Sequence, residues 1–81
     1  MSLPMKYTQY FLATRERNNR KDIKLEWIAQ AFENFVHEEI QTDGRIKRWT
    51  YIEEKQKFLR IVILEDGETI HNAFFDRDFK I

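Results

Sequence analysis

Two Asp-Gly pairs constrain the fold of this chain more than any other feature. They are Asp43-Gly44 and Asp66-Gly67, and they contain the chain's two glycines. Each pair is flanked by alternating apolar and polar residues, and this pattern is typical of a tight turn in a β-hairpin. A polar break over residues 53–56 separates the two hairpins. The pattern therefore predicts four strands joined as an antiparallel meander, over residues 36–41, 45–52, 58–64 and 68–75.

A helix is expected before the first hairpin. One helical face is outlined by apolar residues at i, i+3, i+4 and i+7, namely Leu25, Ile28, Ala29 and Phe32. Lys24 and Asp22 are alternative N-caps for this helix. Asn34 is expected to end it in a left-handed conformation.

An earlier segment, residues 7–17, places Tyr7, Tyr10 and Phe11 on one helical face, although its aromatic and threonine content also suits a strand. We predict a helix there, followed by a loop over residues 18–21. The predicted fold class is therefore α+β, with two N-terminal helical segments packed on a four-stranded antiparallel meander sheet. A chain of 81 residues is too short for two independent cores, so we expect a single domain over residues 1–81.

Composition narrows the classes of function. The chain has no cysteine, which excludes disulfides and thiolate metal sites. It shows neither a signal peptide nor a membrane-spanning apolar run, so we expect a cytoplasmic location. Its 14 basic and 14 acidic residues give no net charge to attract nucleic acid or a membrane. The distribution is uneven, because residues 25–44 hold five acidic residues and no lysine or arginine.

Two-residue turns would set the register of the sheet. They place His71 opposite Val62, Ala73 opposite Arg60 and Glu38 opposite Trp49, while a four-residue loop at 53–56 places Trp49 opposite Arg60. One face then collects Leu59, Ile61, Ile63, Ile70 and Phe74, and the other collects Glu38, Lys47, Trp49, Tyr51, Arg60 and His71. Two short helices cover only one face. The other must be closed by the N-terminal segment, the tail at 76–81, a second subunit or a ligand.

Arg60 and His71 are the candidate catalytic residues. An arginine within a buried strand needs a partner, either Glu38 in a structural ion pair or a bound anion such as phosphate. An alternative is that its side chain extends past Trp49 to solvent. The predicted register brings His71 one diagonal step from Arg60, where the pair could contact phosphate and transfer a proton.

Further basic and aromatic residues could bind RNA or another anion. Arg15, Arg17, Arg20 and Lys21 form a basic cluster, with Tyr7, Tyr10 and Trp49 available for base stacking. The alternative is a solvated helix end and loop. Arg77 lies in a charged tail whose residues are expected to form salt bridges, with anion binding as the alternative. No metal motif is present, and we expect no metal and no cofactor. No glycine-rich phosphate loop or nucleophile elbow is present either, which excludes serine hydrolase, P-loop and Rossmann chemistry.

Three stretches carry a resemblance to known proteins, namely Asp43-Gly44-Arg45-Ile46-Lys47-Arg48-Trp49, Leu59-Arg60-Ile61-Val62 and Ile70-His71-Asn72-Ala73-Phe74-Phe75-Asp76-Arg77. With the order of elements, they resemble small bacterial proteins of unknown function that are similar in layout to the RelE/BrnT toxin superfamily. The resemblance implies a compact α+β ribonuclease fold acting on mRNA and neutralised by an antitoxin. The matching positions would be Arg48, Arg60, His71 and Arg77.

Two functions are therefore expected, and whether the protein is an enzyme stays open. The first is a protein-binding or self-associating module with a RelE/BrnT-like layout, working as a homodimer or with a small antitoxin-like partner through an exposed sheet face. The alternative is a toxin-like endoribonuclease that binds RNA, in which Arg60 and Arg48 neutralise the phosphate and His71 moves a proton.

Overall fold

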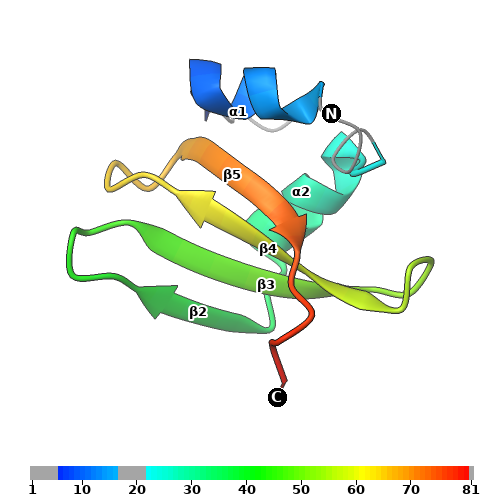
Figure 1. Ribbon diagram of the computed structural model, residues 1–81. Helices are drawn as coiled ribbons and strands as arrows, with labels where there is room; N and C mark the ends of the chain where they lie inside the picture. The colour runs from blue at the N-terminus through cyan, green and yellow to red at the C-terminus, as the bar shows by residue number, and fades with distance from the viewer. Residues whose placement is uncertain (1–5, 17–21, 81) are drawn as a thin grey trace.

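The computed structural model describes residues 6–16 and 22–80, and they form two helices and one five-stranded sheet (Figure 1). Along the chain the elements are β1 (Lys6–Tyr7), α1 (Gln9–Arg15), α2 (Leu25–Glu33), β2 (His37–Ile40), β3 (Ile46–Ile52), β4 (Lys57–Ile63) and β5 (Thr69–Phe75). The strand order is β1-β5-β4-β3-β2. The α+β class and the meander of β2 to β5 confirm the prediction, but the sheet is mixed because β1 pairs with β5 in parallel.

The first segment is a short strand followed by a helix, where only a helix was predicted. Thr8 divides the two, since its backbone N–H donates to the Ile70 carbonyl at 3.1 Å and its side-chain oxygen accepts the Phe11 N–H at 3.0 Å. Thr8 thereby ends the pairing with β5 and caps α1. The segment therefore contains both structures considered from the sequence, a strand at Lys6–Tyr7 and a helix at Gln9–Arg15. The change from extended to helical backbone takes place at Thr8.

The buried face of α2 differs from the predicted stripe. Trp27, Ile28 and Ala31 are buried, whereas Leu25 is 49% exposed. The indole of Trp27 buries more apolar surface than the Leu25 side chain could, so its burial sets the rotation of the helix. Lys24 is the N-cap and forms no side-chain cap hydrogen bond, and Asn34 ends the helix at φ −121°, so the predicted left-handed stop is wrong.

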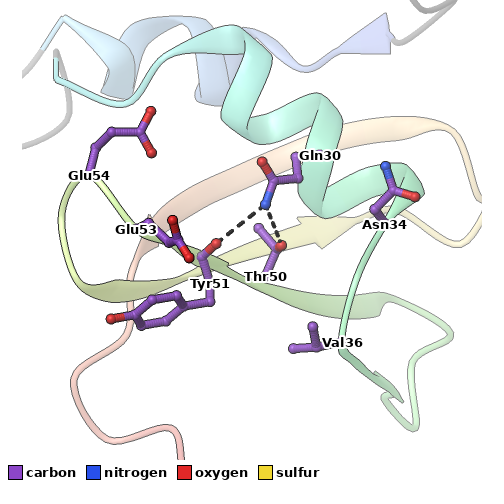
Figure 2. Close-up of a pocket in the computed structure, with 7 residues that line it drawn as sticks. All are labelled: Gln30, Asn34, Val36, Thr50, Tyr51, Glu53 and Glu54. Carbon is purple, nitrogen blue, oxygen red and sulfur yellow. Dashed lines mark hydrogen bonds between the residues drawn. The ribbon is translucent and has the colours of Figure 1, made fainter.

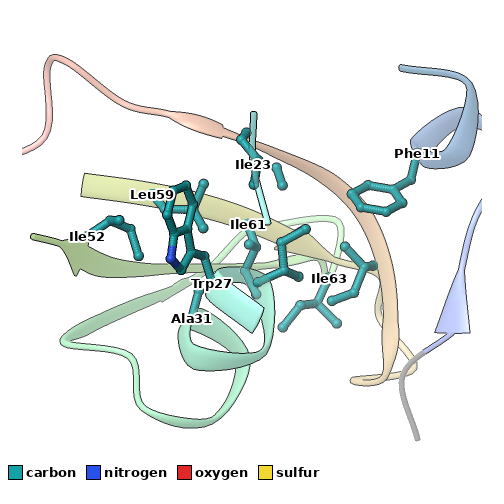
Figure 3. Packing of buried hydrophobic residues seen from close by; sticks show 11 residues of the cluster. Phe11, Ile23, Trp27, Ala31, Ile52, Leu59, Ile61 and Ile63 are labelled. Atoms are coloured by element: carbon teal, nitrogen blue, oxygen red, sulfur yellow. The ribbon is translucent and has the colours of Figure 1, made fainter. Parts of the chain in front are cut away.

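The hydrophobic core lies between the two helices and one face of the sheet (Figure 3). Strands β4 and β5 supply its central layer, with alternate residues pointing inward. Its most deeply buried large side chains include Phe11, Ile23, Ile28, Ile52, Leu59, Ile61, Ile63 and Ile70. Phe74 was predicted on this face, but it lies on the opposite one, across from Arg60.

The first Asp-Gly turn is one residue longer than predicted. The Gly44 N–H donates to the Gln41 carbonyl at 2.9 Å, and the Gln41 N–H donates to the Arg45 carbonyl at 2.8 Å. Gly44 has φ +90°, so the loop is a tight turn closed by a left-handed glycine. The extra residue shifts the register, pairing Glu38 with Arg48 and His37 with Trp49 instead of Glu38 with Trp49. The four-residue loop at 53–56 and the pairing of Trp49 with Arg60 are confirmed.

A β-bulge at His71 changes the register of the second hairpin. Ile63 pairs with Ile70, as a two-residue turn predicts, but Val62 pairs with Asn72. His71 is therefore the extra residue, and beyond it Arg60 pairs with Phe74, so the predicted pairs of His71 with Val62 and of Ala73 with Arg60 are wrong. Every side chain of β5 after the bulge lies on the face opposite to the predicted one.

Candidate functional site

His71 packs against the start of α1. Its Nδ1 lies 3.1 Å from the Thr8 Oγ1, and its ring stacks on Tyr10 with centroids 4.9 Å apart. Because the Thr8 oxygen already accepts the Phe11 N–H, its own hydroxyl hydrogen is available for His71 Nδ1. His71 thus joins the sheet to the helix.

Arg60 lies on the opposite face and has its own partners. Its guanidinium covers the Phe74 ring with the Cζ 4.2 Å from the ring centroid, and its NH1 lies 3.6 Å from the Asp76 Oδ2. Glu38, the partner predicted from the sequence, pairs with Arg48 instead. The contacts of the described residues give Arg60 and His71 no shared partner, so the structure does not assemble the predicted catalytic pair.

Asp76 is the acidic centre of this second face. Partial burial raises the pKa of its carboxyl, but hydrogen bonds from the Trp49 indole N–H and the Asp78 backbone N–H, together with the charge of Arg60, outweigh that effect. The net result is a pKa below the usual value for an aspartate. The carboxylate is therefore a charged anchor at neutral pH.

The C-terminal tail, residues 76–80, covers much of the second face. Phe79 stacks on Trp49 with ring centroids 4.7 Å apart and contacts Phe58 and His37 at 5.0 and 5.4 Å. Trp49 is only 3% exposed as a result. Of the four closures considered from the sequence, the tail is the one seen here. It leaves Trp49 no free ring face for stacking on a base.

Arg48 is held in a structural network at the end of α2. Its Nε donates to Glu38 Oε2 at 2.7 Å and its NH1 donates to the Phe32 carbonyl at 2.8 Å. Its guanidinium also covers the Phe35 ring at 4.6 Å. This arginine therefore caps the helix and ties it to β2 and β3, and its donors face these partners.

The remaining predicted anion-binding residues are scattered. Arg15 ends α1 and has a buried NH1 without a hydrogen-bond partner, whereas Arg77 is exposed in the tail. Arg17 and Arg20 lie outside the described residues. In the described part of the chain, Arg15 lies at the end of α1, Arg48 on β3 beside the end of α2 and Arg77 in the tail, so these three arginines lie on different elements. The predicted basic surface therefore stays a prediction.

The most exposed apolar surface lies instead along the β2 edge, residues 36–40. Val36 is 53% exposed and Ile40 is 70% exposed. Strand β2 ends the sheet and pairs only with β3 among the described strands. Since Gln41 bonds to Arg45, the alternation of an antiparallel ladder directs the backbone groups of Glu38 and Ile40 outward.

Two depressions flank the β2 edge and meet at Val36. The α2-side depression is about 410 Å³ and lies between the end of α2, the end of β3 and the following turn, with Gln30, Asn34, Tyr51, Glu53 and Glu54 in its wall (Figure 2). The tail-side depression is about 450 Å³ and is lined by Val36, His37, Glu39, Asp78, Phe79 and Lys80. Sequence reasoning missed both, because their walls join residues that lie far apart in the chain.

No group of three or more histidine or acidic side chains in residues 6–16 and 22–80 is arranged to hold a metal ion. No helix in the same residues is long and apolar enough to cross a membrane. No protein-family model, curated protein or solved structure matches the chain.

Proposed function

We propose that this protein is a binding module whose β2 edge receives an extended segment of a partner protein. The observation that carries the proposal is the exposure of the edge strand itself, with Ile40 70% exposed beside outward-directed backbone groups. An open edge pairs readily with another strand, and natural proteins usually protect such edges. This function corresponds to the first of the two expected from the sequence, with the contact surface moved from the sheet face to its edge.

The charges on β2 do not protect its edge in the usual way. Glu38 is drawn toward α2 by Arg48, and Glu39 lies 3.1 Å from His37 on the tail side. The Glu38 carboxylate thus contacts Arg48 on the α2 side of the sheet, and the Glu39 carboxylate contacts His37 on the tail side. The apolar side chain of Ile40 and the backbone remain to meet an incoming strand.

The RNA-cleaving alternative has weaker support. Arg48 and Arg60 each contact a carboxylate, and His71 contacts α1. A shared phosphate would require these side chains to leave their partners. The RelE/BrnT resemblance stays a prediction.

The test compares an edge variant with a matched control for retention of a partner. Ile40→Lys places a charge on the open edge, and Leu25→Lys places the same charge on an α2 residue that is 49% exposed. Proteins from the natural host that bind wild type and Leu25→Lys, but not Ile40→Lys, would be purified. Hydrogen exchange of the complex should then show protection at the Glu38 and Ile40 amides. Equal retention by both variants, or protection confined to other elements, contradicts the proposal.

A further inference from the structure

The α2-side depression has the electrostatics of a cation-binding site. Glu53 and Glu54 line it, and the amide nitrogen of Gln30 is already used in donating to the Thr50 hydroxyl at 2.9 Å and the Tyr51 carbonyl at 3.3 Å (Figure 2). The Gln30 amide oxygen is thereby left as an acceptor. Tyr51 contributes its backbone carbonyl on this side, whereas its ring packs against Phe58, with centroids 5.1 Å apart, on the second face of the sheet.

The end of α2 is already partnered by a cation. Helix α2 ends at Glu33 with Asn34 as its C-cap, and its last turn contains no basic residue. The Arg48 guanidinium, which donates to the Phe32 carbonyl at 2.8 Å, instead offsets the partial negative charge of this carboxyl end. The preference of the depression for positive charge therefore rests on two carboxylates and a free amide oxygen.

The tail-side depression has a different character. Val36 and the rings of His37 and Phe79 give it an apolar wall. The charge of Lys80 offsets that of a carboxylate there. It therefore suits an apolar side chain better than a charged one.

The two depressions lie on opposite sides of the sheet and share Val36. A strand added to the β2 edge would direct successive side chains alternately to one side and to the other. One residue would thus point toward the α2-side depression and its neighbour toward the tail-side depression.

A second copy of this chain fits the edge poorly. Antiparallel pairing of two β2 strands about their centre, through their outward groups, would set either Glu38 or Glu39 against the same residue of the other copy, and like charges directly opposite are destabilising. Residues 25–44 contain no lysine or arginine to offset them. Charge complementarity therefore favours a basic partner over self-association.

Building on the proposed function, we infer that the partner segment is an amphipathic strand with a basic face and an apolar face. A lysine or arginine enters the α2-side depression beside Glu53 and Glu54. The adjoining apolar residue packs on the tail side against Val36 and Phe79.

Two synthetic peptides test the inference. The probes are acetylated, amidated strands that alternate lysine with valine or glutamate with valine, titrated into the intact protein and followed by backbone amide NMR. The lysine peptide should shift the amides of Glu38, Ile40 and Tyr51 and bind about tenfold more tightly than the glutamate peptide, with the difference shrinking at high salt. Equal binding, tighter binding of the glutamate peptide, or no binding of either overturns the inference.

Four variants locate the effect. Glu53→Gln with Glu54→Gln should remove most of the preference for lysine, whereas Glu26→Gln with Glu65→Gln removes the same charge elsewhere and should leave it unchanged. Ile40→Pro removes an outward N–H and should abolish binding of both peptides, while Ile40→Thr keeps that N–H and should retain binding. A preference that survives the first double variant overturns the inference.

These outcomes separate the inference from the proposed function. If the natural partner needs Ile40 but the peptides show no charge preference, the function stands and the inference fails. If sedimentation shows a dimer that Ile40→Lys dissociates, the edge binds a second copy and the inference of a basic partner is wrong. If the natural partner ignores Ile40, the proposed function itself fails.

Discussion

The Asp76 carboxylate accepts a hydrogen bond from the Trp49 indole N–H at 3.0 Å, which ties the C-terminal tail to the centre of the sheet. Trp49 is 3% exposed and Arg60 contacts the same carboxylate oxygen. Asp76 is thus the partner of two polar groups on the second face, the Trp49 indole N–H and the Arg60 guanidinium. The tail is consequently part of the folded domain.

Replacing Asp76 with alanine should lower the free energy of unfolding by about 1–3 kcal/mol, because it leaves the buried indole N–H without an acceptor. Urea denaturation measures this loss, and the Trp49 indole resonance should shift. Asp78→Ala is the matched control, since Asp78 is exposed and contributes its backbone N–H. Equal destabilisation by the two variants would contradict the anchoring role of Asp76.

Acid should weaken the same contact. The folded state lowers the pKa of Asp76 below 3.8, so its contribution to stability is fully present above that value. As the pH falls below 3.8, the unfolded carboxyl gains a proton first, and the contribution disappears once the pH passes below the folded-state pKa. Asp76→Asn should therefore lose less free energy of unfolding than wild type between pH 5 and pH 2, as measured in a series of urea denaturation curves. Parallel losses in the two proteins would argue against this linkage.

Arg48→Lys should be destabilising even though the charge is kept. A lysine cannot maintain the hydrogen bonds to Glu38 and to the Phe32 carbonyl while covering the Phe35 ring, so we expect a loss of about 1 kcal/mol. Arg45→Lys is the control, because Arg45 lies 3.7 Å from Asp43 with 41% of its side chain exposed, and it should change stability by less than about 0.5 kcal/mol. Thermal and urea unfolding of both variants provide the comparison.

The two glycines should respond differently to alanine. Gly44 and Gly67 have φ of +90° and +77°, so either substitution strains the backbone by about 1–2 kcal/mol. A Cβ at Gly44 would also lie 3.1 Å from the Glu65 Cβ, whereas a Cβ at Gly67 meets nothing within 4 Å. Gly44→Ala should therefore be the more destabilising variant in urea denaturation, and the reverse order would show that the two hairpin turns do not pack as described.

Several parts of the fold could be predicted from the residues alone because they depend on local preference. Asp-Gly pairs adopt turns that few other dipeptides allow, and the alternation in β4 specifies which side is buried once a sheet forms. The helical spacing of apolar residues over 25–33 likewise predicted an amphipathic helix. The cap at Thr8 also has a local sequence signal, since threonine is a favoured N-cap residue.

The candidate site could not be predicted in the same way, because single-residue shifts decide which side chains meet. The bulge at His71 separates it from Arg60, and the longer first turn transfers Glu38 from Trp49 to Arg48. Neither shift has a strong local signature. Each reflects which arrangement best packs the whole sheet.

By itself, the sequence determined the meander of the four long strands and the presence of two helices, since turn residues and hydrophobic period act over a few neighbours. The tertiary structure alone decided that β1 joins the sheet, that the tail covers Trp49, and that Asp76 rather than Glu38 partners Arg60. These features join residues far apart in the chain. Their energies come from burial and hydrogen bonding in the assembled fold, which no local pattern specifies.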